Sequence, residues 1–301
     1  KPDSLGSPMP TLPHRDGVKA GIYDPRPQNP WGVFIAGSAE SLDVGNDGNA
    51  SGFDIETGGV TLGIDYRPNK HVAIGLFEQY INSDVDLVNE GSVDTDGMKF
   101  GLYGTVHNDA GFYLNGLVAV GSSDFETRRL GLGGYADGDT DGWDLDAMFS
   151  GGFTKQVGSL TLSPFASLIY QRQQIDEFTE TGSMLPLEIR DQSEDSLVSR
   201  LGIEASYQWQ FGGVSVVPRI SLAWQHEFLR DSYEINARLA GAPQNGFTVS
   251  GPDMGRDSLD LRASVDVRWN SDLVTYVSYQ TELGRSNYQV SSVTLGLHYS
   301  F

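Results

Sequence analysis

The sequence predicts an all-β protein: a transmembrane antiparallel up-and-down β-barrel of about twelve strands that follows an extended N-terminal segment. Three observations predict this fold. Apolar and polar residues alternate with a period of two over most of the chain, short and long connections follow one another between the alternating segments, and the last such segment closes on Phe301. Mean hydropathy is only −0.29, which fits a barrel because its strands turn just every second side chain toward lipid. No stretch approaches the roughly 18 uninterrupted apolar residues of a membrane-spanning helix, so a helical membrane protein is excluded.

The segment 259–269 shows the alternation most clearly. Its odd positions are apolar from Leu259 to Trp269, and its even positions include Asp260, Arg262 and Asp266. A soluble β-sandwich would bury this polar face without partners, whereas a barrel has lipid on one face and water or a charge network on the other. The segment therefore favours a barrel over a sandwich.

Twelve segments carry this pattern, an even number as is usual for single-chain bacterial barrels. They lie near residues 31–43, 54–67, 71–86, 94–107, 111–126, 140–155, 159–175, 194–210, 213–229, 256–269, 273–286 and 291–301. Short connections are predicted near 67–70, 108–110, 156–158, 211–212 and 270–272, and longer ones near 44–53, 87–93, 127–139, 176–193 and 230–255. Short and long alternate without a break, which predicts periplasmic turns at one end and extracellular loops at the other.

Aromatic residues gather near the short connections. Barrels carry such residues at the membrane–water interface, so we expect a girdle in the inner leaflet. Its members would be Trp31, Tyr66, Tyr207, Trp209 and Trp269, with Phe301 close by.

Residues 1–30 differ from the barrel segment 31–301 and form a separate region. They hold seven of the thirteen prolines and show no periodicity. Proline removes a backbone donor and fixes φ, so this region is neither helix nor central strand and reads as an extended linker or lumen arm. At about 3.1 Å per residue it could cross a membrane-thick barrel with length to spare.

Charge limits the partners of the chain. The formal net charge is −20, which argues against nucleic acid because phosphate neutralisation needs Lys and Arg. The absence of cysteine fits an oxidising envelope compartment. No secretory signal is recognised from Lys1 onward, so we expect a mature or partial chain.

Both signs of charge are predicted on the inner face of the barrel. Pairing with one another across strands is the preferred interpretation for any single one of these side chains, and the alternative is that they contact a threaded segment or tune ion passage. The candidates for contact with the linker are Arg200, Glu204, Arg219, Arg262, Asp266 and Arg268.

The last strand resembles the sorting signal that is read by the outer-membrane barrel assembly machinery. A terminal aromatic follows a tyrosine two positions earlier and apolar residues at the preceding alternate positions, and a strand with a free edge can pair with an insertase. The residues that carry this resemblance are Val293, Leu295, Leu297, Tyr299 and Phe301.

The start of the barrel adds a second resemblance. The stretch from Trp31 to Ile35 and the glycine-rich stretch from Thr57 to Arg67 resemble the opening strands of the autotransporter β-domain of type V secretion. With the last strand, the resemblance covers about residues 31–301. It implies a twelve-stranded outer-membrane barrel, with extracellular loops and a segment in the lumen, that exports or anchors an upstream passenger. The implied partners are that passenger, outer-membrane lipids including lipopolysaccharide, the assembly machinery and periplasmic chaperones. The lumen segment is commonly helical in the family, whereas residues 1–30 are proline-rich.

A stand-alone channel or structural barrel is the main alternative. Self-cleavage at Asn29 is disfavoured because Pro30 follows it and has no amide hydrogen. An outer-membrane hydrolase needs a histidine with partners at the outer rim, and only His226 approaches it, so no catalytic residue and no enzymatic activity is expected.

Residues 137–142 match the start of a calcium loop. Met148 stands where such a loop has its bidentate Glu, so a plain Gly/Asp-rich surface loop is the preferred interpretation. We expect no metal and no cofactor.

Overall fold

The computed structural model describes residues 30–46, 50–87, 91–229, 234–242, 244–252 and 254–301. The predicted arm up to Asn29 lies outside the described residues. Every element of the described chain is a β-strand. In this part of the chain no helix is long and apolar enough to cross a membrane.

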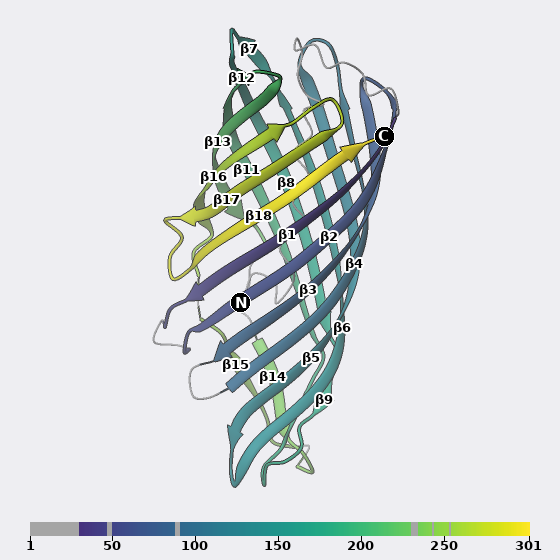
Figure 1. Cartoon of the computed structure of the whole chain (residues 1–301). Helices are drawn as coiled ribbons and strands as arrows, with labels where there is room; N and C mark the ends of the chain where they lie inside the picture. Colours follow the sequence, from purple (N-terminus) through teal and green to yellow (C-terminus); the bar gives the residue numbers. More distant parts are fainter. Residues whose placement is uncertain (1–29, 47–49, 88–90, 230–233, 243, 253) are drawn as a thin grey trace.

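Twelve antiparallel strands close into a barrel (Figure 1). The first strand pairs with the last, and each strand pairs with the next along the sheet, as predicted. The strands are β1 (Trp31–Val44), β2 (Phe53–Asn69), β3 (Val72–Leu87), β4 (Gly91–His107), β5 (Phe112–Gly131), β6 (Gly134–Phe153), β8 (Leu160–Ile175), β11 (Gln192–Tyr207), β13 (Val214–Glu227), β16 (Asp257–Arg268), β17 (Leu273–Leu283) and β18 (Gln289–Ser300). Two short strands extend the ladder near the short turns: β7 (Lys155–Val157) pairs with β8, and β12 (Trp209–Phe211) pairs with β13.

The predicted long loop at 127–139 is wrong. β5 and β6 continue as one ladder in which Arg128 lies opposite Asp137 and Leu130 opposite Tyr135. Only two residues join the strands, and Gly133 adopts φ +82° there, a conformation that favours glycine. Because residues 137–142 lie within β6, neither the calcium loop nor the plain surface loop is correct.

A second, four-stranded sheet lies in the long connections after β8 and β13. Its order is β15–β14–β10–β9. Its strands are β9 (Phe178–Thr179), β10 (Leu187–Ile189), β14 (Glu234–Leu239) and β15 (Gly246–Ser250). The connections predicted as loops at 176–193 and 230–255 therefore contain paired strands.

Aromatic rings on the inner wall lie over glycines of neighbouring strands. A Cβ on Gly63 would meet the ring of Phe34 at 2.1 Å, and one on Gly75 would meet Tyr103 at 2.4 Å. Such close packing is possible only where the side chain is a hydrogen atom. The rings of Phe34 and Tyr103 join Phe77, Leu117 and Ala119 in a buried cluster inside the barrel.

Candidate functional site

The two ends of the barrel differ, and the start of β1 and the end of β18 lie at the same end. Trp31 pairs with Tyr66 beside the β2–β3 turn, and the amide of Phe301 donates to the Trp31 carbonyl at 3.0 Å. We call this the short-turn end and the opposite one the long-loop end. The chain that precedes Trp31 therefore meets the barrel at the short-turn end.

The aromatic residues singled out by the sequence lie on the outward face at this end. The rings of Trp31 and Tyr66 are 4.7 Å apart between centroids, and those of Tyr207 and Trp209 are 5.8 Å apart. Trp269 is half exposed, and its indole Nε1 donates to Thr275 Oγ1 at 2.9 Å.

The structure has a second set of outward aromatic residues that the sequence analysis does not predict. Tyr80 donates to Asp96 Oδ1 and Tyr170 to Asp195 Oδ1, each at 2.5 Å, and Trp224 Nε1 donates to Asp257 Oδ1 at 3.0 Å. In all three pairs the carboxylate lies on the next strand, two residues nearer the long-loop end than the residue directly opposite the aromatic one. Each ring thus turns its polar atom toward the long-loop end. Amphipathic rings adopt this orientation at the boundary between an apolar and a polar surface. The sequence signal would have been an outward aromatic residue placed diagonally to an acidic one, which requires the strand register.

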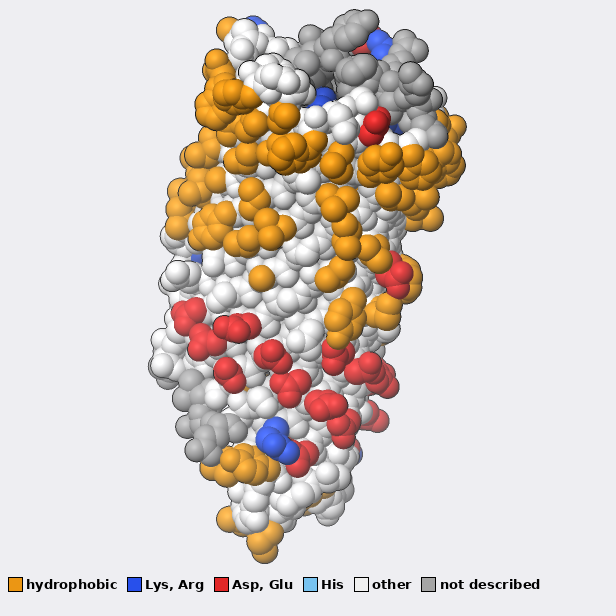
Figure 2. Space-filling model, viewed as in Figure 1, with side chains coloured by type: hydrophobic (Ala, Val, Ile, Leu, Met, Phe, Trp, Pro, Cys, Tyr) orange, Lys and Arg blue, Asp and Glu red, His pale blue; other side chains and the backbone are white. Residues whose placement is uncertain are grey.

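Beyond this boundary the outward face is acidic, and Figure 2 shows the carboxylates as a band below the apolar surface. Many lie directly opposite one another, as in the run Glu56, Asp84, Asp94, Glu126 and Asp139. The exposed members of this acidic band are Asp43, Asp54, Glu56, Asp84, Asp86, Asp94, Asp96, Asp124, Glu126, Asp139 and Asp141. Facing like charges repel and could not lie against hydrocarbon, so water or polar head groups must solvate this half of the wall.

Lys99 is the centre of one polar network inside the barrel. It is 2% exposed, and its Nζ lies 2.7 Å from Asp144 Oδ2 and 2.5 Å from Asp146 Oδ2. Gln171 donates to the other Asp146 oxygen at 3.0 Å. The lysine side chain crosses β5 at Gly121, where a Cβ would lie 2.7 Å from Lys99 Cγ. The network thus joins β4, β6 and β8 over the strand between them.

The predicted lumen charges are brought together only in part. Arg219 forms an ion pair with Asp266, and its Nε lies 3.8 Å from Glu204 Oε1. Arg200 donates to Gln225 at 3.1 Å and Arg262 to Gln280 at 2.6 Å, so each contacts an amide on a neighbouring strand. The sixth candidate, Arg268, lies on β16 in register with Ser215 of β13.

One ion pair links two short turns. Lys70 Nζ donates to the two carboxylate oxygens of Asp109 at 2.8 and 2.9 Å. This hydrogen bond lowers the pKa of Asp109 below its usual value.

Among the described residues, no three His, Cys, Asp or Glu side chains are arranged to hold a metal ion.

The family model of the autotransporter β-domain matches residues 33–280. An extracellular serine protease of Serratia marcescens is 29% identical over 266 residues, which are 85% of this chain and 25% of the protease. Esterase EstA of Pseudomonas aeruginosa is 26% identical over 237 residues, which are 73% of this chain and 35% of the esterase. The chain therefore spans about a quarter to a third of the length of these relatives.

Solved structures support the same fold. The translocator domain of the autotransporter NalP from Neisseria meningitidis superposes with a TM-score of 0.73 at 18% identity, over 92% of this chain and 91% of that one. The β-domain of the Bordetella autotransporter BrkA gives 0.71 at 19% identity, over 91% of this chain and all of that one. The closed twelve-stranded barrel, its apolar outer wall and the match over residues 33–280 together show that this chain belongs to the autotransporter β-domain family of the bacterial outer membrane.

Proposed function

We propose that this barrel is the translocator and anchor of a longer protein, whose upstream passenger it brings to the cell surface. The observation that carries the proposal is the position of Trp31 at the short-turn end, beside the end of the last strand. An upstream segment that begins there has to pass to the other end of the barrel in order to emerge among the long loops. The relatives, several times longer than this chain, support the existence of such a segment.

The long loops are extracellular in this proposal, and the short turns are periplasmic. The alternation of connection lengths supports this orientation, as does the acidic band next to the long loops. Outer-membrane lipids, including lipopolysaccharide, would then contact the apolar belt between the two sets of aromatic residues.

The arm 1–30 passes through the lumen, where it contacts the inner charges Arg200, Glu204, Arg219, Arg262, Asp266 and Arg268. The mixed charges of both partners support this contact, because residues 14–26 carry His14, Arg15, Asp16, Lys19, Asp24 and Arg26. Release of the passenger by cyclisation of Asn29 is not part of the proposal, since Pro30 cannot supply an amide hydrogen.

Assembly uses the last strand as its signal, with periplasmic chaperones and the barrel assembly machinery as partners. The signal residues Val293, Leu295, Leu297, Tyr299 and Phe301 are all exposed on the outer wall. Because β18 pairs with β1 only when the barrel closes, its edge is free before closure and can pair with an insertase.

We infer that the barrel itself is not an enzyme. On the outer wall His226 Nδ1 contacts Asp257 Oδ1 at 2.9 Å, and Ser199 lies opposite His226 in the register. No hydrogen bond joins Ser199 to His226 in the described part of the chain. The backbone around Ser199 pairs with β8 on one side and with β13 on the other, so its amides are not available as oxyanion donors. The purified barrel should hydrolyse neither phospholipid nor peptide; an activity that disappears in His226→Ala would contradict the inference.

Single-channel conductance in a planar bilayer tests the main proposal. The full chain is compared with a variant that lacks residues 1–29. The deletion should convert a nearly closed barrel into a steady nanosiemens-scale pore. Equal conductance of the two proteins would place the arm outside the lumen and favour a stand-alone channel.

A further inference from the structure

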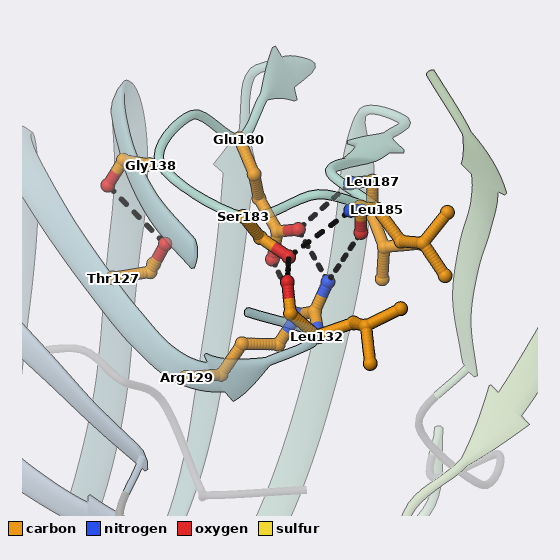
Figure 3. A network of polar contacts seen from close by, with 8 residues as sticks. All are labelled: Thr127, Arg129, Leu132, Gly138, Glu180, Ser183, Leu185 and Leu187. Atoms are coloured by element: carbon orange, nitrogen blue, oxygen red, sulfur yellow. Dashed lines mark hydrogen bonds and ion pairs between the residues drawn. The ribbon is translucent and has the colours of Figure 1, made fainter. Parts of the chain in front are cut away.

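The β5–β6 turn and the β9–β10 loop form one unit at the long-loop end. We call this unit, residues 127–138 and 178–187, the rim tip. Arg129 donates from Nε and Nη2 to the two carboxylate oxygens of Glu180, both at 2.6 Å, as Figure 3 shows. The amide of Leu187 donates to the same carboxylate at 2.8 Å. Glu180 is only 4% exposed, so its carboxylate is shielded from water, and the two-pronged pair with Arg129 holds the loop over the turn.

Backbone contacts fix the same two segments at further points. Asp137 and Thr181 exchange two backbone hydrogen bonds, at 3.0 and 2.7 Å. The amide of Met184 donates to the Leu132 carbonyl at 2.9 Å, and Ser183 Oγ donates to the same carbonyl at 3.3 Å. The rim tip is therefore preorganised.

The outside of this unit exposes apolar side chains beside the Arg128–Asp137 ion pair. Met184 is 74% exposed and Leu132 is 60% exposed, and both lie beside Gly133. Leu130, its cross-strand partner Tyr135 and Leu185 are also exposed. Apolar side chains gather at this lower end of the molecule in Figure 2, separated by the acidic band from the apolar belt above. Lipid contact does not explain this surface, and a clustered apolar surface exposed to water indicates an interaction site.

We propose that the rim tip binds residues 1–13 of this chain after the arm has crossed the lumen. The inference rests on the proposed function, because it needs the arm inside the barrel. β5 has 20 residues. With about 3.3 Å per residue and a tilt of about 40°, the wall is roughly 50 Å tall. A chain extended at about 3.1 Å per residue crosses that height in about 16 residues. Of the 29 residues before Pro30, about thirteen therefore emerge beside the long loops.

The composition of residues 1–13 fits this surface. Leu5, Met9 and Leu12 are apolar, and Pro8, Pro10 and Pro13 favour a polyproline II conformation, which loses little entropy on docking. The two charges, Lys1 and Asp3, cancel, so the acidic wall does not repel the segment.

Engineered cysteine pairs test the inference, because the chain contains no cysteine of its own. Met9→Cys is combined with Met184→Cys in the full chain, folded in lipid vesicles and oxidised. The matched control combines Met9→Cys with Val157→Cys, because Val157 is also well exposed (61%, against 74% for Met184) but lies at the short-turn end. A third pair, Ala20→Cys with Ser221→Cys on the inner wall, reports passage through the lumen. Heat-modifiable gel mobility verifies that each variant is folded.

A disulfide at Met9–Met184, with none in the Met9–Val157 control, is the expected result. Leu132→Asp in the same background should slow that disulfide about tenfold, since it removes an apolar contact of ordinary strength. If Ala20–Ser221 forms a disulfide and Met9–Met184 does not, the inference is overturned while the lumen proposal stands. If neither pair forms, both are overturned, and equal pairing of Met9 with both ends also overturns the inference.

Discussion

His298 on the last strand reaches across the first strand to Asp65 on β2. His298 Nε2 lies 3.0 Å from Asp65 Oδ2, and both side chains are almost fully buried. The inward-facing residue of β1 opposite Asp65 is Gly32, which has no side chain to obstruct the contact. Tyr103 from β4 donates to the same oxygen at 3.4 Å. The seam of the barrel is thus closed by a side-chain contact in addition to the β1–β18 ladder.

Replacing His298 by Ala should weaken this seam. The substitution removes a hydrogen-bonding partner of the buried Asp65 carboxylate, and breaking a buried pair in this way costs about 3 kcal/mol. The measurement is the free energy of unfolding in urea with the barrel in lipid, together with the temperature of the heat-modifiable gel shift. Leu297→Ala, which alters the lipid-facing neighbour, serves as control and should cost less. Equal losses in the two variants would show that the contact does not close the seam.

Alanine at Gly121 should disturb the Lys99 network. Its Cβ would lie 2.6 Å from Asp144 Oδ1 and 2.7 Å from Lys99 Cγ. Because these groups are buried and paired, we expect a loss of about 2 kcal/mol in the free energy of unfolding, as for other overpacked sites. Gly116→Ala on the same strand is the matched control, since its Cβ would come no nearer than 4.0 Å to Met148 O. If Gly121→Ala leaves the free energy of unfolding unchanged, Lys99 does not need the space above β5.

The barrel strands could be predicted because lipid outside and a polar interior impose a period of two on each strand. Where β5 and β6 rise above the lipid, water wets both faces and the pattern weakens, as in the consecutive pair Arg128 and Arg129. A loop was therefore predicted where a hairpin exists. The contacts between interior side chains could not be predicted from the sequence, for a different reason. The pairing of Lys99 with Asp146 depends on the register of three strands and on a glycine in the middle one.

The four-stranded sheet β15–β14–β10–β9 should loosen in acid. Arg238 on β14 donates a hydrogen bond to Glu188 on β10 and thereby lowers the pKa of Glu188 below its usual value. A lowered folded-state pKa stabilises the sheet above the ordinary Glu value of about 4.3, and this contribution is lost as the pH falls through the lowered value. Hydrogen exchange of the β10 and β14 amides, corrected for the intrinsic rate, should show the opening. Arg238→Met should exchange faster at neutral pH and lose the acid dependence; a parallel profile in both proteins would speak against the ion pair.

Lysine substitutions on one strand can locate the edge of the hydrocarbon. Val118 and Asp124 both point outward on β5, the first in the apolar belt and the second in the acidic band. Val118→Lys should cost about 2–4 kcal/mol in the free energy of folding into lipid vesicles, because an ammonium near the midplane loses its hydration. Asp124→Lys should cost nothing and should relieve repulsion, since Asp96 and Asp141 lie directly opposite on the two neighbouring strands. Similar penalties at both positions would extend the hydrocarbon over the acidic band, and the long-loop half of the wall would then not stand above the lipid.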